Sequence, residues 1–453
     1  MKTLITLLLL VPCAVNAADS PNFIVILGEG SGWSSSSVQM DDRNPASKST
    51  SLETPNLERL AKDGMRFSNG YAASPRCTPS RAALFTGRTP AALHMTFIGD
   101  GKRQAAVTTK LLPPQASMEL PAAAVTIGEL LKSAGYATAH FGKWHVGRAS
   151  PEQHGFDESD GATNNGGPDE VANPNPKQAL AMTAKGIDFM ERQVKARKPF
   201  YLQMSHYPSQ NEKGGGRKPR SPEQNQSEMD IVDQTVGQVL DAVDRLGIAA
   251  DTYILYTTDH GTPGRNLPLT GGKGTLSEGG LRVPFIIRGP GIKAGVCSHV
   301  FVSSLDLLPT FAKLAGSSEP LPAELDGGSL VPLLTHEGTG TVKRRHEEFI
   351  VHFPHYDKDP LGPGSAIFVG DYKLIRTYET GGPCLYDLSK DPGERNDLAA
   401  EMPERAADLD KRLTAYLTSV KAQMPAANPE YDPANPGTSS PRGKRGGRKN
   451  ENP

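Results

Sequence analysis

The chain lacks the charge excess and the cysteine content that mark several classes of protein. Its 453 residues hold 49 Lys and Arg against 50 Asp and Glu, a formal net charge of −1, so the basic excess of nucleic-acid-binding proteins is absent. Four cysteines are too few for a scaffold that depends on disulfides. The 37% of hydrophobic residues suffice for one large core with a small satellite domain.

No apolar run of membrane-spanning length is present either. Residues 1–17 combine Lys2, the apolar run Leu4 to Val11 and a small-residue end at Ala17, which is typical of a cleaved secretory signal peptide. The apolar run is too short to cross a bilayer, and the residues before Cys13 match a lipid-attachment site poorly. We therefore expect an exported protein, periplasmic or secreted, that is neither a lipoprotein nor an integral membrane protein.

Three cysteines remain once the signal peptide is removed. Cys77 belongs to a motif described below, which leaves Cys297 and Cys384. In an oxidising compartment these two thiols could pair or could stay apart as buried thiols, and the sequence leaves both open.

Strand and helix patterns alternate through the first 340 residues. The apolar run 22–27 ends at Gly28, as a doubly buried parallel strand does. Further strands are predicted at 136–142, 199–207 and 252–258, and helices at 54–61, 126–134, 178–194 and 227–246. We expect an α/β fold with a large mixed, mostly parallel sheet sandwiched by helices.

Polar side chains follow three of the predicted strands. Glu29 comes directly after the first strand, and Asp259 and His260 end another. Ligands of open α/β sheets bind at the carboxyl ends of the strands, so these three residues are candidate ligands of a divalent cation. Lys143 and His145 lie two residues apart on an extended segment, where they point to the same side and could reach one anion.

The stretch 75–88 places a thiol at the start of a predicted helix. Pro79 fits the first turn, and Arg81 with the run Ala-Ala-Leu-Phe continues the helix. The backbone N–H groups and the helix dipole favour an anion at Cys77. Lys273, on the glycine-rich segment 271–280, adds a positive charge that could meet an anion. The alternative is a structural cysteine at a helix N-terminus.

The pattern Cys-x-Pro-Ser-Arg at 77–81, followed by Leu-x-Thr-Gly-Arg at 84–88, resembles the signature of the formylglycine-dependent sulfatases, members of the alkaline-phosphatase-like superfamily. The run 135–145, with its Gly-Lys-Trp-His end, resembles the family's second signature. The resemblance extends from residue 21 to about residue 420. It implies that a maturation enzyme oxidises Cys77 to formylglycine, whose hydrate attacks sulfur.

The resemblance also implies roles for single residues. The implied catalytic set is Cys77, Arg81, Lys143, His145 and Lys273. Within it, the three cations would surround the sulfate oxygens and His145 would assist breakdown of the hemiacetal sulfate. The implied metal, expected to be calcium, would be bound by Glu29, Cys77, Asp259 and His260.

Two positions depart from the family pattern. Sulfatases typically carry two adjacent Asp ligands after the first strand, and the second position here is Gly30. Water, Asp41 or Asp42 could supply the missing ligand. A sulfate-binding His is also usual where this chain has Gln210, with His206 as an offset substitute. Glutamine can donate a hydrogen bond, but it has no titratable proton and cannot carry charge. This weakens the proposal that the residue at this position protonates the leaving group.

The character of the chain changes beyond residue 340. Short strands at 346–353, 366–369, 372–378 and 384–388 predict a small antiparallel sheet, followed by a helix at 403–420. We expect a signal peptide at 1–17, a catalytic domain at 18–340, an α+β subdomain at 341–424 and a disordered tail at 425–453. Surface loops are expected at 151–176 and, with basic character, at 211–222. His352 and His355 are candidates for substrate contact, with ordinary loop histidines as the alternative.

These patterns predict an exported sulfatase that hydrolyses sulfate esters of a polysaccharide or oligosaccharide. The expected partners are the sulfated carbohydrate and the formylglycine-generating maturation enzyme, without nucleic acid. A phosphodiesterase or phosphonate monoester hydrolase of the same superfamily is the first alternative, because sulfate and phosphate esters are similar tetrahedra. A catalytically weak glycan-binding protein is the second, motivated by Gly30 and Gln210.

Overall fold

A computed structural model describes residues 20–99, 108–166, 177–208, 222–264, 266–379 and 382–434. An eight-stranded sheet has the order β10-β2-β9-β8-β1-β7-β5-β6. Its central strands are parallel: β8 (Thr252–Thr258), β1 (Asn22–Gly28), β7 (Phe200–Ser205) and β5 (Ala137–Gly142). The outer strands are β9 (Phe285–Arg288), β2 (Met65–Phe67), β10 (Val296–Ser298) and β6 (Glu158–Ser159), and only the pairings of β9 are antiparallel. The predicted mixed, mostly parallel sheet is confirmed.

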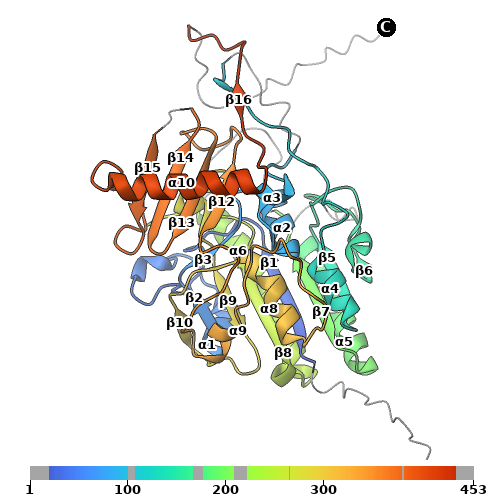
Figure 1. The fold of residues 1–453 in the computed structure, drawn as a ribbon. Helices are drawn as coiled ribbons and strands as arrows, with labels where there is room; N and C mark the ends of the chain where they lie inside the picture. The colour runs from blue at the N-terminus through green and yellow to red at the C-terminus, as the bar shows by residue number, and fades with distance from the viewer. Residues whose placement is uncertain are drawn as a thin grey trace, which may run out of the picture.

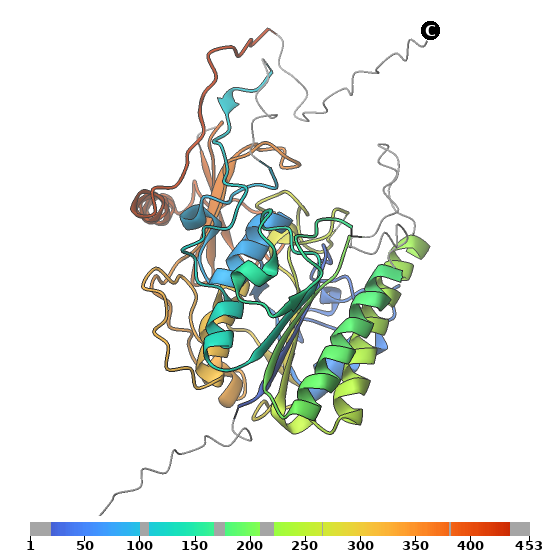
Figure 2. The ribbon, with the colours of Figure 1, turned by 90° about the vertical axis from the view of Figure 1, so that its right-hand side faces the viewer.

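Side chains of β1 alternate between two hydrophobic layers. Phe23, Val25 and Leu27 pack on one face, and Ile24 and Ile26 on the other, all fully buried. One face is covered by α2 (Cys77–Thr86), α4 (Ile127–Ser133) and α8 (Leu307–Leu314), the other by α1 (Pro55–Asp63), α5 (Lys177–Ala196) and α6 (Pro222–Arg245). Figure 2 shows α5 and α6 together on one side of the sheet. The four helices predicted from apolar periodicity are thus present as α1, α4, α5 and α6.

A second, smaller sheet stands beside the first, as predicted. It is antiparallel, in the order β12 (Phe349–Phe353), β13 (Gly364–Val369), β14 (Tyr372–Thr377) and β15 (Pro383–Asp387), and α10 (Pro403–Ser419) packs across it (Figure 1). Phe349 and Phe368 share a hydrophobic cluster with Tyr71 and Leu305 of the larger unit. The two sheets therefore share a packed interface, and the boundary near residue 340 stays a prediction.

Short elements connect these layers. They are β3 (Gly70–Tyr71), which pairs with β11 (Val302–Ser303), the helices α3 (Pro90–Leu93), α7 (Glu278–Leu281) and α9 (Val331–Thr335), and 3-10 turns at Pro45–Ser47, Pro151–His154, Ala249–Asp251 and Ser304–Asp306. Along the described ranges, no helix combines the length and the apolar character needed to cross a membrane.

One expected loop and the tail expected to be disordered each contain a short paired strand. Within 151–176, β6 extends the large sheet beside β5, and Phe156 is buried in its core. Within the tail expected to be disordered, Ala426–Ala427 forms β16, which pairs with β4 (Leu111–Leu112). Both pairings involve only two residues, which leaves too short a pattern for strand prediction from sequence. The signal peptide, Gln210 and nearly all of the loop 211–222 lie outside the described residues.

The remaining thiols are unpaired. Cys297 lies on β10 of the large sheet and Cys384 on β15 of the small one, and both are free and partly exposed. Of the two arrangements left open by the sequence, the structure therefore has separate thiols.

Buried charges join the two sheets. Lys373 on β14 lies 3.0 Å from a Glu278 oxygen and 2.6 Å from a Glu394 oxygen, and Arg282 lies 2.7 Å from Glu278. These side chains are at most 4% exposed. Burial, followed by the charge of Glu278, raises the pKa of Glu394 to about 7, although Lys373 opposes the shift. Glu394 therefore keeps a proton in the folded protein at pH values where an unfolded chain would release it.

This shift predicts a pH-dependent stability. Because the folded state binds the extra proton, the stability contributed by Glu394 is lost as the pH rises from about 4.5 towards 7. Glu394→Gln cannot titrate, so the fall in unfolding free energy across that window should shrink by on the order of 1 to 3 kcal/mol. Urea unfolding from pH 4.5 to 7.5 measures this, with the exposed Glu401→Gln as the matched control. Equal pH slopes for Glu394→Gln and wild type would contradict the assignment.

Candidate active site

The carboxyl ends of the central parallel strands bring the predicted polar residues together. Glu29 follows β1, Asp259 and His260 follow β8, and Lys143 follows β5. Since β8, β1, β7 and β5 are adjacent and parallel, their ends meet at one edge of the sheet. The N-terminus of α2 adds Cys77 to this edge.

Cys77 contacts one metal-ligand candidate from each of two neighbouring strands. Its Sγ lies 3.1 Å from Glu29 Oε1 and 3.1 Å from His260 Nε2. Burial and the charge of Glu29 would raise the pKa of this thiol, but Lys143, His260 and Lys273 together hold it well below its ordinary value. The lowered pKa favours the thiolate in a positively charged, buried setting, which is the environment of a reactive cysteine rather than of a structural one.

Arg81, one turn further along α2, holds the two carboxylates in place. One of its terminal nitrogens lies 2.9 Å from Glu29 Oε2 and 3.1 Å from Asp259 Oδ2, and its Nε lies 3.2 Å from the same Asp259 oxygen. The guanidinium is fully buried. Its fork geometry allows one cation to bridge carboxylates from two strands, which a lysine could not do in the same way.

Two lysines from separate loops complete the charge balance at Glu29. Lys143 Nζ lies 3.0 Å from Glu29 Oε2, and Lys273 Nζ lies 3.2 Å from Oε1. Burial alone would raise the pKa of Glu29, but these two cations and His260 keep it well below its ordinary value. Seven of the sequence-predicted residues therefore converge from three strand ends, one helix and one glycine-rich loop: Glu29, Cys77, Arg81, Lys143, Asp259, His260 and Lys273.

His145 reaches the same place through a turn. We expected an extended segment, but β5 ends at Gly142, whose φ of 97° and whose close approach to the Ser205 carbonyl leave no room for a side chain. His145 itself has a left-handed φ of 59°, which is uncommon for a residue with a side chain. Burial lowers its pKa, while a hydrogen bond with Cys77 acts in the opposite direction. A buried imidazole beside Cys77 is thus kept neutral and able to accept a proton.

The donor set fits a divalent cation. Single donor atoms of Glu29, Cys77, Asp259 and His260 all lie within 4.8 Å of one another. Burial and the nearby charge of Glu29 raise the pKa of Asp259 to about 6, a repulsion that a cation would relieve. His260 Nδ1 lies 2.9 Å from the Gly261 carbonyl, so Nε2 is the ring nitrogen that faces the group. Burial would lower the pKa of His260, but the charge of Asp259 raises it to about 9, so a bound cation would take the place of the Nε2 proton.

Gly30 makes room for that imidazole. Its φ is 64°, and a Cβ at this position would lie 3.0 Å from His260 Cε1. A carboxylate side chain here would therefore need both a strained backbone and space that the ring occupies. Asp41 and Asp42 do not replace it, because Asp41 bonds Arg43 at 3.2 Å and Asp42 lies 3.1 Å from His299.

Three further histidines lie apart from this group. His206 follows β7, but its ring nitrogens face the Leu27 carbonyl at 3.4 Å and Thr235 of α6 at 2.8 Å. His352 contacts Ser365 and the Gln423 carbonyl, and His355 contacts Thr96 at 2.8 Å. All three are at most 1% exposed. The structure thus buries the residues expected to contact substrate, and Gln210 lies outside the described residues.

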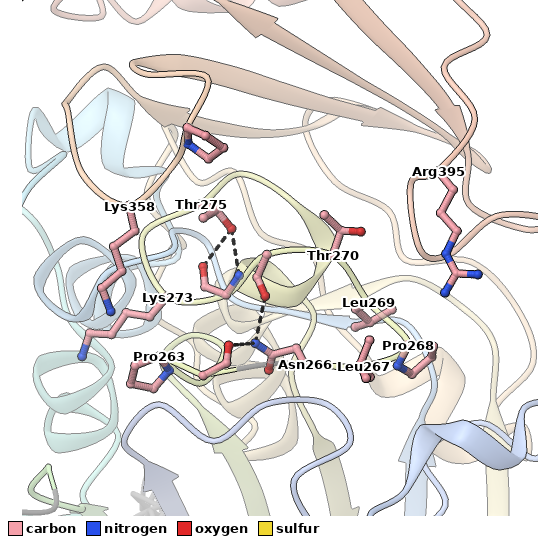
Figure 3. A pocket seen from close by; sticks show the side chains of 14 residues that line it. Pro263, Asn266, Leu267, Pro268, Leu269, Thr270, Lys273, Thr275, Lys358 and Arg395 are labelled. Atoms are coloured by element: carbon pink, nitrogen blue, oxygen red, sulfur yellow. Dashed lines mark hydrogen bonds between the residues drawn. The ribbon is translucent and has the colours of Figure 1, made fainter. Parts of the chain in front are cut away.

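A pocket of about 460 Å³ adjoins the group, and Lys273 lines it. Its walls come from the loop after β8 and from loops of the small-sheet unit that carry Lys358 and Arg395. In Figure 3, Lys273 and Lys358 extend towards one end of the pocket, and Arg395 stands near the other. Lys358 and Arg395 are not recognisable as pocket residues from sequence patterns, because their position depends on how the two sheets pack.

The small sheet also supports the start of α2. Asp357, on the loop after β12, forms a bidentate ion pair with Arg76, the residue before Cys77. A charge pair between distant parts of the chain therefore holds the two units together beside Cys77.

Comparisons with known proteins agree with this geometry. The sulfatase family model matches residues 21–317, and a model described as N-sulphoglucosamine sulphohydrolase, C-terminal, matches residues 272–423. The chain is 31% identical to human arylsulfatase A, over 93% of this chain and 92% of that protein. It is 32% identical to the N-acetylgalactosamine-6-sulfatase of Mus musculus, over 91% of this chain and 88% of that protein.

Solved structures show the same fold. The crystal structure of Ps i-CgsB in complex with k-i-k-neocarrahexaose superposes with a TM-score of 0.72 at 23% identity, over 88% of this chain and 93% of that one. Together with the family match over most of the chain, the fold and the residues around Cys77 lead to one assignment. The chain belongs to the sulfatase family and is a sulfuric ester hydrolase.

Proposed function

We infer that the protein is an exported sulfatase that releases inorganic sulfate from a sulfated polysaccharide or oligosaccharide. One observation carries the proposal: Cys77 lies in a buried group with Glu29, Asp259 and His260, and three cations converge on that group. A sulfate ester carries its negative charge on oxygens, and such a preorganised set of cations is suited to stabilise it.

Cys77 is the proposed site of formylglycine formation by a maturation enzyme, and the hydrated aldehyde would supply an oxygen nucleophile for sulfur. The other residues act around that position. Arg81, Lys143 and Lys273 neutralise the sulfate oxygens, and they need little reorganisation because they already surround Glu29. Neutral His145, beside Cys77, accepts the proton that the hydrate must lose.

The proposed metal is calcium, held by Glu29, Asp259 and His260 with the modified side chain of residue 77 as a further ligand. When bound, the cation supplies Lewis-acid polarisation of a sulfate oxygen. Calcium prefers oxygen ligands, and the His260 imidazole is an unusual donor for it. Compared with an all-oxygen site, this nitrogen ligand raises the affinity for manganese or zinc relative to that for calcium.

The carbohydrate substrate is proposed from the pocket and from the relatives. Lys358 and Arg395 line a space of about 460 Å³ that leads from Lys273, where further anionic groups of a saccharide could lie. One structural neighbour was solved with D-glucosamine-2-N,6-O-disulfate as its substrate, and another with k-i-k-neocarrahexaose. Export is proposed from residues 1–17.

Product analysis tests the proposed reaction. The purified enzyme, incubated with defined sulfated saccharides, should release sulfate from at least one of them, and Cys77→Ala should release none. Aryl sulfate and aryl phosphate are compared in parallel, because the same nucleophile could serve a phosphodiesterase. Turnover of aryl sulfate without desulfation of any saccharide would contradict the carbohydrate substrate, and faster release of phosphate than of sulfate would contradict the reaction.

One lysine variant and one arginine variant distinguish a residue that acts on the reacting sulfate from a residue that binds the rest of the saccharide. Lys273→Ala removes a cation at the reacting group and should lower kcat about 10²- to 10³-fold on aryl sulfate and saccharide alike. Arg395→Ala should raise KM several-fold for a multiply sulfated oligosaccharide and leave the kinetics on a small aryl sulfate unchanged. Equal effects of Arg395→Ala on both substrates would contradict a role of the pocket in saccharide recognition.

Metal binding is tested by thermal unfolding. After chelator treatment, added Ca²⁺ should raise the midpoint, because a ligand at 100 times its Kd stabilises the folded state by about 2.7 kcal/mol. Asp259→Asn should lose most of this shift, whereas Asp251→Asn, on an exposed turn, should keep it. Mn²⁺ and Mg²⁺ are measured in the same way. Absence of a shift with every divalent cation would contradict the metal site.

A further inference from the structure

We propose that Asp42, Cys297 and His299 form a second metal site, of the zinc type, at the outer edge of the large sheet. One donor atom from each of these residues lies within 4.8 Å of the others. The group is separate from the one around Cys77 and shares no residue with it. The proposal therefore does not depend on the proposed substrate or on the formylglycine.

The edge strand and one loop bring the three donors together. Cys297 on β10 and His299 just after it are two residues apart, so their side chains project from the same side of the strand. The loop after β1 carries Asp42 to them, with the His299 Nε2 3.1 Å from an Asp42 oxygen. The Cys297 thiol lies 3.5 Å from the Met40 carbonyl of the same loop. Two contacts thus hold the loop against β10.

The histidine is oriented for coordination. Ser68 Oγ lies 2.9 Å from the His299 Nδ1, on the side of the ring away from Asp42. With Nδ1 bonded to Ser68, Nε2 is the ring nitrogen that faces Asp42 and could serve as the ligand atom. Ring orientation by a hydrogen bond at the second nitrogen is usual for histidine ligands of metals.

The donor types select a borderline-soft cation. A thiolate, an imidazole and a carboxylate together suit zinc, whereas calcium and magnesium prefer oxygen ligands alone. Arg43 leaves the group available, because it bonds Asp41 rather than Asp42. Burial raises the pKa of the Cys297 thiol, and Arg66 opposes this only in part, so coordination would have to displace the thiol proton. Asp42 is 50% exposed and His299 32%, so the site is open to metal in solution and water can fill a fourth position.

The bound metal would fasten the loop after β1 to the sheet edge. This loop begins at Glu29, in the group around Cys77, and reaches Asp42 before it returns to α1. A cation shared by Asp42 and β10 fixes the far end of that loop. Coordination would also occupy the partly exposed thiol of Cys297, which is otherwise free in a protein with a predicted oxidising destination.

Cobalt substitution tests the site, because Co²⁺ bound to a thiolate gives a near-ultraviolet charge-transfer band. The test uses the full-length protein with Cys77→Ser, which removes the thiol of the other group. We expect the band to be complete within two equivalents of Co²⁺, because the group around residue 77 can take one of them, and we expect Zn²⁺ to remove it. Cys297→Ser in this background should abolish the band, and Cys384→Ser, at the other partly exposed thiol, should keep it. Persistence of the band without Cys297, or its absence from the folded Cys77→Ser protein, would overturn the proposal.

Two milder variants keep the test decisive if Cys297→Ser fails to fold. Asp42→Asn changes an exposed side chain and should weaken Co²⁺ binding at least about tenfold, measured by titration of the band. Ser68→Ala removes the partner of the His299 Nδ1 and should weaken it about tenfold as well. Unchanged affinity in both variants would contradict the site, whatever the behaviour of Cys297→Ser.

Discussion

The structure depends on a charge balance buried at the carboxyl ends of the central strands. Glu29, Asp259 and Cys77 form the acidic set, and Arg81, Lys143, Lys273 and His260 form the basic set. Neither set could be buried alone, because unpaired charges in a protein interior are costly. The paired set is instead a preformed site for an anion and a cation, and its members come from three strand ends, the helix α2 and one glycine-rich loop.

The two sheets depend on each other around this balance. The ion pair between Arg76 and Asp357 holds the start of α2 against a loop of the small sheet, and Lys373 reaches Glu278 across the same interface. The pocket beside Lys273 has walls from both units. The small sheet therefore shapes the site as well as covering the core, and variants in its loops should change substrate choice more than chemistry.

The main strands and helices were predictable because their patterns are local, and so was the convergence of residues that directly follow parallel strands. Residues whose direction depends on tertiary packing were not. His206 follows β7 as predicted, yet its ring turns to Thr235 under α6. Asp41 and Asp42 are candidates for the metal shell from their place in the sequence, yet their carboxylates pair with Arg43 and His299. Gly30 departs from the family pattern, and only the structure relates it to the His260 ring.

The central claim is that residue 77 acts as an aldehyde at the centre of this buried group. Mass spectrometry of the peptide containing Cys77, from active protein coexpressed with a maturation enzyme, tests it most directly. The account predicts that the CH₂–SH side chain is replaced by CHO, and that specific activity rises in proportion to the converted fraction. An unmodified thiol in fully active protein would contradict it.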